Sequence, residues 1–111
     1  MIDLATTTMW TVAKEFSNQE EFEQTYMYSP VWGAETELSE EDLDYRRKRL
    51  VQVWLAAHRT FTILVQLSGL SQKGFSQLYA IPVRSVENWC RDVSTPPPYV
   101  VLLLSEAMGL I

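Results

Sequence analysis

The clearest structural pattern in the chain lies in residues 70–98, which read LSQKGFSQLYAIPVRSVENWCRDVSTPPP. Ser71 is a favoured N-cap residue, because its hydroxyl can accept a backbone N–H of the first helical turn. Apolar and aromatic side chains follow at the spacing of one inward helix face, namely Phe75, Leu78 and Tyr79. The pattern therefore predicts a short helix that begins after Ser71.

A second short helix is predicted directly after the first. Ala80-Ile81 indicates a tight turn, and Pro82 has a fixed φ that suits the first turn of a helix. The expected inward residues of this helix are Val86, Trp89 and Cys90. The expected outward residues are Val83, Arg84, Ser85, Glu87, Asn88 and Arg91. Two such helices joined by a short turn form a helix-turn-helix, here over residues 71–92.

A longer helix is predicted upstream of this motif. Ser39 followed by acids resembles a capping box, and an apolar stripe follows at Leu43, Leu50, Trp54, Ala57 and Phe61. We expect a break near residues 58–60 and a helix end at Gly69, where glycine suits a left-handed C-terminal position. His58 at this break is expected to cap or pack rather than to act as a base.

The basic run Arg46-Arg47-Lys48-Arg49 lies inside the predicted long helix. Asp42 precedes Arg46, and Asp44 precedes Lys48, at the i,i+4 spacing that favours ion pairs on a helix surface. Two interpretations remain open for the run, a solvated face with ion pairs and a surface that contacts phosphates.

A closing helix is predicted over residues 99–108, after three consecutive prolines. Its expected buried stripe is Val100, Leu103, Leu104 and Ala107. Leu102 and residues 109–111 would then remain apolar and exposed. Such a surface either forms an interface or packs back onto the core.

The first 38 residues form an acidic, aromatic-rich arm whose structure the sequence does not determine. Residues 3–16 are consistent with a short strand or an irregular segment, and Ser17-Asn18 indicates a helix start. The aromatic cluster at residues 26–32 either packs onto the rest of the domain or binds a partner. We expect an all-α chain, with this arm preceding a helix-turn-helix bundle of four to five helices over residues 39–111.

Composition excludes several classes of protein. The 111 residues are 47% hydrophobic and 21% charged, which fits one compact domain rather than a disordered chain. One cysteine and one histidine exclude an internal disulfide and leave too few ligands for a zinc site. The N-terminus lacks the basic and apolar regions of a signal peptide, and no apolar stretch approaches membrane-spanning length, so we expect a cytoplasmic protein.

Charge is distributed unevenly along the chain. Residues 1–45 hold eleven Asp and Glu residues against Lys14 alone, a net charge of −10. Residues 46–111 hold eight basic residues against three acidic ones, a net charge of +5. This asymmetry suggests two parts with different roles.

The C-terminal half resembles a known family. The matching residues are Leu70–Gln72, Phe75, Ser76, Leu78, Ile81–Pro82, Arg84–Glu87, Trp89–Cys90, Pro96, Tyr99–Leu104 and Gly109–Ile111. They are similar to the helix-turn-helix of the phage-repressor-like (Xre/Cro) superfamily, and in particular to small proteins of gut Clostridia-type bacteria and their mobile elements. The resemblance covers about residues 58–111 and implies a sequence-specific transcriptional regulator. It further implies a recognition helix from Pro82 to about Asp92 in the DNA major groove, and a homodimer that reads two half-sites.

The resemblance and side-chain chemistry together designate a set of DNA-contacting residues. Arg84 can donate hydrogen bonds to O6 and N7 of guanine, and Asn88 can pair with N6 and N7 of adenine. Gln72 matches a family residue that contacts the DNA backbone or the bases. Lys73, Ser85 and Arg91 are expected to contact phosphates. The family usually has glycine where this chain has Ala80, so a left-handed backbone there would cost roughly 1 kcal/mol.

An alternative function uses the acidic arm rather than the helix-turn-helix. Its glutamates could mimic phosphates and occupy the basic groove of a protein partner, as an antitoxin or an anti-CRISPR-like inhibitor would. The residues expected to do so are Glu20, Glu21, Glu23, Glu35, Glu37, Glu40 and Glu41. An enzyme is not expected, because there is no phosphate-binding glycine loop and no Cys/His pair at a recognisable spacing, and we expect no cofactor.

Overall fold

The computed structural model describes residues 2–33 and 37–111, and all secondary structure in these ranges is helical. The elements are α1 (Leu4–Ala13), α2 (Gln19–Tyr26), the 3₁₀ helix η1 (Pro30–Trp32), α3 (Glu40–His58), α4 (Phe61–Ser68), α5 (Gln72–Tyr79), α6 (Val83–Cys90) and α7 (Pro98–Ala107). The prediction of an all-α chain is confirmed for these residues. None of these helices has by itself the length and apolar composition needed to cross a bilayer, although α3 and α4 reach those limits when counted together.

The chain divides into two compact units. The first unit is Met1–His58 together with Gly109–Ile111, and the second unit is Arg59–Met108. The predicted boundary lies between residues 38 and 39, whereas in the structure α3 groups with the N-terminal helices. The second unit covers nearly the same residues as the region 58–111, for which a family resemblance was expected.

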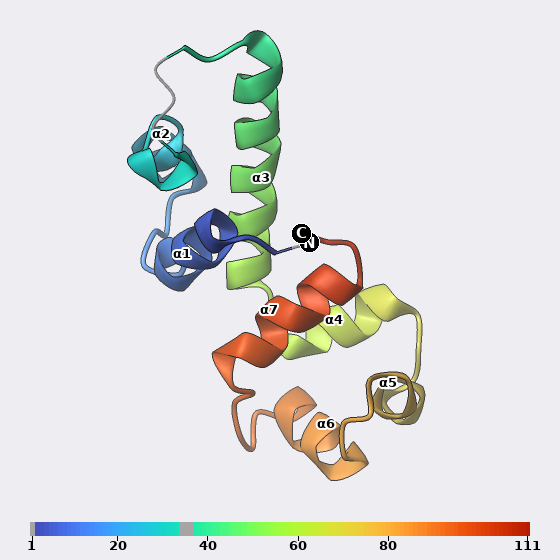
Figure 1. Ribbon diagram of the computed structural model, residues 1–111. Helices are drawn as coiled ribbons and strands as arrows, with labels where there is room; N and C mark the ends of the chain where they lie inside the picture. The colour runs from blue at the N-terminus through green and yellow to red at the C-terminus, as the bar shows by residue number, and fades with distance from the viewer. Residues whose placement is uncertain (1, 34–36) are drawn as a thin grey trace. The chain divides into compact units, whose positions relative to one another are not determined.

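In the first unit, α1 and α2 both pack against α3 (Figure 1). Its buried apolar side chains are Met9, Trp10, Ala13, Phe22, Leu50, Val53, Ala56 and Ala57. The expectation of a strand or an irregular segment over residues 3–16 is wrong, because residues 4–13 form α1. The Asp3 carboxylate accepts the Thr6 N–H at 2.7 Å and caps this helix. The helix was not predicted because a series of β-branched threonines lowers its helix propensity.

Side-chain caps set the helix boundaries in this unit. The Asn18 side chain accepts the N–H groups of Glu20 and Glu21 at the start of α2, as predicted. Ser39 and Asp42 form the expected capping box, in which the Asp42 carboxylate accepts the Ser39 N–H at 3.0 Å and Ser39 Oγ accepts the Asp42 N–H at 3.1 Å.

In the second unit, α4 contacts α5, α6 and α7, and so forms the centre of the bundle (Figure 1). The Thr60 side chain caps the start of α4, and Gly69 ends it in a left-handed conformation with φ 72°. The predicted break at residues 58–60 and the predicted end at Gly69 are both confirmed. The buried apolar side chains are Phe61, Leu64, Val65, Phe75, Val86, Val101, Leu102 and Leu104.

The buried face of α7 differs from the prediction. Val101, Leu102, Leu104 and Ser105 are buried, whereas Leu103 was expected inside and is 55% exposed. Leu102 was expected outside. The error follows from the run of five apolar residues at positions 100–104, which covers the helix on every side, so that periodicity cannot select a face.

Candidate nucleic-acid interface

The connection between α5 and α6 is short and held by hydrogen bonds. Each helix has eight residues, and Ala80, Ile81 and Pro82 join them. The Ile81 N–H donates to the Ser76 carbonyl at 3.0 Å, and Ser76 Oγ donates back to the Ile81 carbonyl. Ala80 adopts a left-handed conformation, with φ 54° and ψ 39°, as the sequence analysis considered for this position. The turn therefore has one defined geometry.

Aromatic contacts hold α6 against the rest of the second unit. Phe75 and Val86 are fully buried, and Trp89 is half-buried. The Phe61 ring meets the edges of both neighbours, with centroids 5.5 Å from Phe75 and 5.1 Å from Trp89. Thr62 Oγ1 also donates to the Cys90 carbonyl at 3.3 Å, near the end of α6. These contacts fix which face of α6 points outward.

Two expectations about the inner faces of this motif need correction. Leu78 was expected in the core and is 62% exposed. The small Ser76 is buried instead, because its hydroxyl satisfies the Ile81 carbonyl inside the turn. Cys90 was also expected in the core but is only half-buried.

The outer face of α6 displays the residues designated for DNA contact. Arg84 is exposed on the first turn of the helix, and Asn88 follows one turn later and is half-buried. Ser85 is also half-buried. Helix α6 is shorter than the expected 82–92, since Pro82 is its N-cap and Arg91 its C-cap, and Asp92 has a left-handed φ of 57°. Arg91 is therefore exposed at the end of the helix rather than within it.

The remaining two designated residues lie at the start of α5. Gln72 and Lys73 are exposed in its first turn, directly after the Ser71 cap, whose Oγ accepts the Gly74 N–H at 3.0 Å. The second unit as a whole holds four basic and three acidic residues, whereas the first holds five basic and eleven acidic ones. The designated residues thus lie in the unit with the more positive net charge, +1 in the second unit against −6 in the first.

The glutamates of the alternative site are distributed over several segments. Glu20 and Glu21 are in the first turn of α2, and Glu40 and Glu41 are in the first turn of α3. All four are exposed, as is Glu37, whereas Glu23 is half-buried and Glu35 lies outside the described residues. Acids in a first turn stabilise the positive end of the helix dipole, so four of these residues have a local role.

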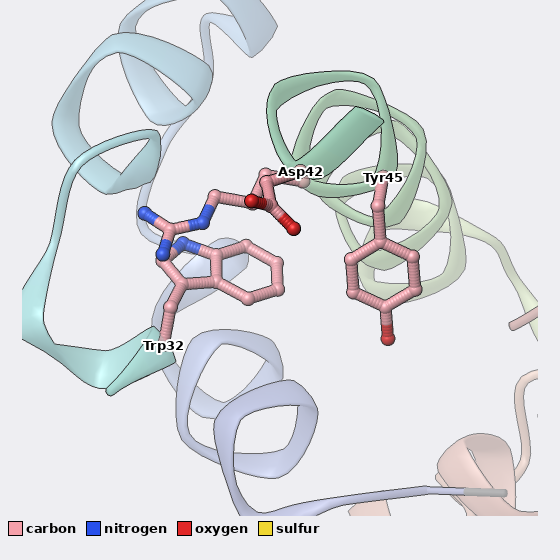
Figure 2. A pocket seen from close by; sticks show the side chains of 4 residues that line it. Trp32, Asp42 and Tyr45 are labelled. Atoms are coloured by element: carbon pink, nitrogen blue, oxygen red, sulfur yellow. The ribbon is translucent and has the colours of Figure 1, made fainter. Parts of the chain in front are cut away.

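The basic run on α3 contains a residue that sequence reasoning missed. Arg46 was expected on a solvated face or at a phosphate, but only 6% of it is exposed. Its Nη1 donates to the Met27 carbonyl at 3.0 Å, and its guanidinium lies over the Trp32 ring. Arg46, Trp32, Asp42 and Tyr45 line a small open hollow of about 160 Å³ (Figure 2). No local signal reveals this burial, because the partners come from distant positions in the sequence.

The other charged groups near this hollow behave as surface residues. Asp44 pairs with Arg47 at 3.0 Å, three residues away, rather than with Lys48 as predicted, and both partners are largely exposed. The Ser39 backbone N–H and hydroxyl, and more weakly the Arg46 charge, hold the pKa of the Asp42 carboxyl below its ordinary value.

His58 packs at the end of α3. Its ring stacks on Trp54 with centroids 4.0 Å apart. Its Nδ1 lies 2.8 Å from the Trp54 carbonyl oxygen and donates to it, because a carbonyl oxygen can only accept. The described residues hold no group of three His, Cys, Asp or Glu side chains placed to bind a metal ion.

No family model matches the chain, and neither a curated protein nor a solved structure shows significant similarity to it. Its function is therefore inferred from its own residues and their arrangement.

Proposed function

We propose that this protein binds specific sequences in double-stranded DNA and regulates transcription, with α5 and α6 acting as a helix-turn-helix. The observation that carries the proposal is the division of α6 into two faces. Val86 is fully buried and Trp89 packs on Phe61, while Arg84 projects from the opposite side. A helix fixed in this way presents its outer side chains to a major groove, which is wide enough to admit it.

Each residue designated for DNA contact has a role that fits its chemistry. Arg84 has the planar donors that match O6 and N7 of guanine, and Asn88 can pair with N6 and N7 of adenine. Lys73, Ser85 and Arg91 hold the protein on the phosphates, which sets its register without reading sequence. Gln72 lies beside Lys73 at the start of α5, where it can contact the backbone or a base edge.

A second copy of the chain supplies the affinity that one copy lacks. Lys73 and Arg91 are the two basic residues assigned to phosphates, and two such contacts give a weak electrostatic contribution, because log K falls with log salt by about 0.9 per phosphate neutralised. On α7, Tyr99 and Leu103 lie one turn apart, 64% and 55% exposed. Burying this uncharged pair against its copy creates an isologous dimer without like-charge repulsion. Such a dimer reads two half-sites one helical turn apart.

The acidic alternative predicts a different behaviour. A protein that mimics phosphates through Glu20, Glu21, Glu40 and Glu41 binds a basic partner and has no affinity for duplex DNA. In the structure these glutamates lie in the first turns of α2 and α3, and Glu20 Oε1 also accepts a hydrogen bond from Gln24 Nε2 at 3.3 Å within the same helix. We therefore treat protein binding as the competing outcome of the DNA test.

The test is fluorescence anisotropy of the full chain with a pool of random duplexes, from about 50 to about 200 mM salt. A monomer that neutralises two phosphates should give a log–log slope of about −2, and a dimer about −4. Binding with a slope in this range supports the proposal. Absence of binding at the lowest salt contradicts it and favours a protein partner.

A further inference from the structure

Val83 is the apolar residue among the outward side chains of α6. It is the first residue of α6 and is 44% exposed, next to the exposed Arg84. The other side chains of α6 that point away from the core of the second unit are polar or charged, namely Arg84, Ser85, Glu87 and Asn88. An exposed valine in this position contributes nothing to solubility or to helix propensity. Val83 is therefore the outward residue of α6 whose side chain is suited to contact an apolar group.

The side chain of Val83 is held rigidly. Valine has one strongly preferred χ1 rotamer in a helix, because two methyl groups branch from its Cβ. Pro82 directly before it has a fixed φ, and the Pro82 carbonyl accepts the N–H groups of Ser85 and Val86. The two methyl groups consequently have a defined direction before any ligand arrives, so little entropy is lost when they make a contact.

The major groove offers one apolar group to such a side chain. Thymine carries a C5 methyl group, whereas the other groove-facing atoms of the base pairs are mainly hydrogen-bond donors and acceptors. Successive residues of a helix project about 100° apart, so Val83 and Arg84 reach neighbouring base pairs from the same turn. We infer that Val83 contacts the C5 methyl of a thymine that neighbours the guanine read by Arg84. This inference rests on the proposed DNA binding and adds a specificity-determining residue to it.

The test removes only the methyl group. The probe is the tightest duplex selected by the full chain from a randomised pool of about 20 base pairs, enough for two half-sites. Each thymine is then replaced in turn by deoxyuridine, which keeps every hydrogen-bonding group and lacks the C5 methyl. At one position in each half-site, the wild-type Kd should rise about fourfold, the effect of exposing one buried methyl group.

Two valine variants identify the residue responsible. Val83→Ala should bind the thymine and deoxyuridine duplexes with nearly equal affinity, since its single methyl is too short to reach the base. Val93→Ala is the matched control, because Val93 is 63% exposed in the connection that follows α6. This control should keep the full preference for thymine. Circular dichroism of both variants confirms that the helices remain folded.

The possible outcomes separate this inference from the proposed function. If the wild type binds the selected duplex but no deoxyuridine replacement changes its Kd, the inference is wrong while DNA binding stands. If Val83→Ala keeps the thymine preference, another residue makes the contact, and the inference is again wrong. If the wild type binds no duplex at low salt, DNA binding and the inference both fail.

Discussion

The guanidinium of Arg46 lies over the indole ring of Trp32, with its central carbon 5.3 Å from the ring centroid. The same group donates a hydrogen bond to the Met27 carbonyl, which belongs to the end of α2. Trp32 in turn donates its indole N–H to the Tyr26 carbonyl at 2.7 Å. One side chain of α3 thus holds both the end of α2 and the 3₁₀ helix in place.

Replacing Arg46 with alanine should destabilise the protein. The substitution removes a hydrogen bond from a charged donor and leaves a partly buried carbonyl without it, a loss of about 2–3 kcal/mol in the free energy of unfolding. Arg47→Ala is the matched control, since this neighbouring arginine is exposed and forms only a surface ion pair, and it should cost less than about 0.5 kcal/mol. Urea denaturation followed by circular dichroism measures both values. Equal losses in the two variants would show that Arg46 has no structural role.

Replacing Ala80 with glycine should stabilise the protein. Ala80 has φ 54°, a conformation that costs an L-residue with a Cβ roughly 1–2 kcal/mol. Part of this gain is offset by the greater freedom of glycine in the unfolded chain, which leaves a net gain of about 0.5–1 kcal/mol.

Asp92 provides the comparison for this prediction. It also has a positive φ, of 57°, but aspartate adopts the left-handed conformation more readily than alanine. Asp92→Gly should therefore raise the free energy of unfolding by less than Ala80→Gly in the same urea experiment. A loss of stability in Ala80→Gly would contradict the geometry of the turn between α5 and α6.

Local cap chemistry accounts for the helix boundaries that could be predicted. Ser39, Thr60, Gly69 and Ser71 each act within three or four residues of their own position, so their effect is readable from the sequence. The left-handed conformation that was considered for Ala80 is also present, because a tight turn between two short helices is likewise set by neighbouring residues. By contrast, α1 contains three consecutive threonines, which reduce helix propensity and conceal a helix that packing on α3 stabilises.

Features that depend on distant partners could not be predicted. Arginine is rarely buried without a partner, and the carbonyl that accepts from Arg46 belongs to a residue 19 positions earlier. The exposure of Leu78 has a local origin that the apolar pattern does not reveal, because the hydrogen bond from Ser76 to the turn selects the buried face of α5. The outward position of Arg84 was predictable, since Val86 and Trp89 mark the opposite face of a short and strongly amphipathic helix.

Acid should weaken the start of α3. The Asp42 carboxylate accepts hydrogen bonds from the Ser39 N–H at 3.0 Å and from its hydroxyl at 2.9 Å, and these donors lower the pKa of the carboxyl. Because the folded-state pKa lies below the unfolded one, the carboxylate stabilises the fold above the unfolded pKa. This contribution is lost as the pH falls through the folded pKa, below about pH 4.

Carboxyl titration by NMR tests this relation directly. Ser39→Ala removes the hydroxyl donor and should raise the pKa of the Asp42 carboxyl toward its ordinary value. Asp42→Asn keeps an acceptor oxygen but does not titrate, so its free energy of unfolding should fall less between pH 7 and pH 3 than that of the wild type. An unchanged Asp42 pKa in Ser39→Ala would refute the role of the hydroxyl.

Dimer formation through α7 should depend on Leu103. Leu103→Glu places a charge at the centre of the proposed contact and at its symmetry-related copy, and it should convert the dimer to a monomer. Leu67→Glu is a closely matched control on α4, because Leu67 is 54% exposed and Leu103 is 55% exposed. Light scattering after size-exclusion chromatography gives the mass of each variant. A dimer that survives Leu103→Glu would place the interface elsewhere.

The most direct test of DNA recognition by α6 is the Kd of Arg84→Ala for the selected duplex, with Arg47→Ala as the control. Both substitutions remove one exposed arginine and one positive charge, but only Arg84 lies on the outer face of α6. Loss of a bidentate guanine contact should raise the Kd of Arg84→Ala roughly tenfold to a hundredfold for each half-site, while Arg47→Ala binds like the wild type. Equal affinities of the two variants would contradict the assignment of α6 as the recognition helix.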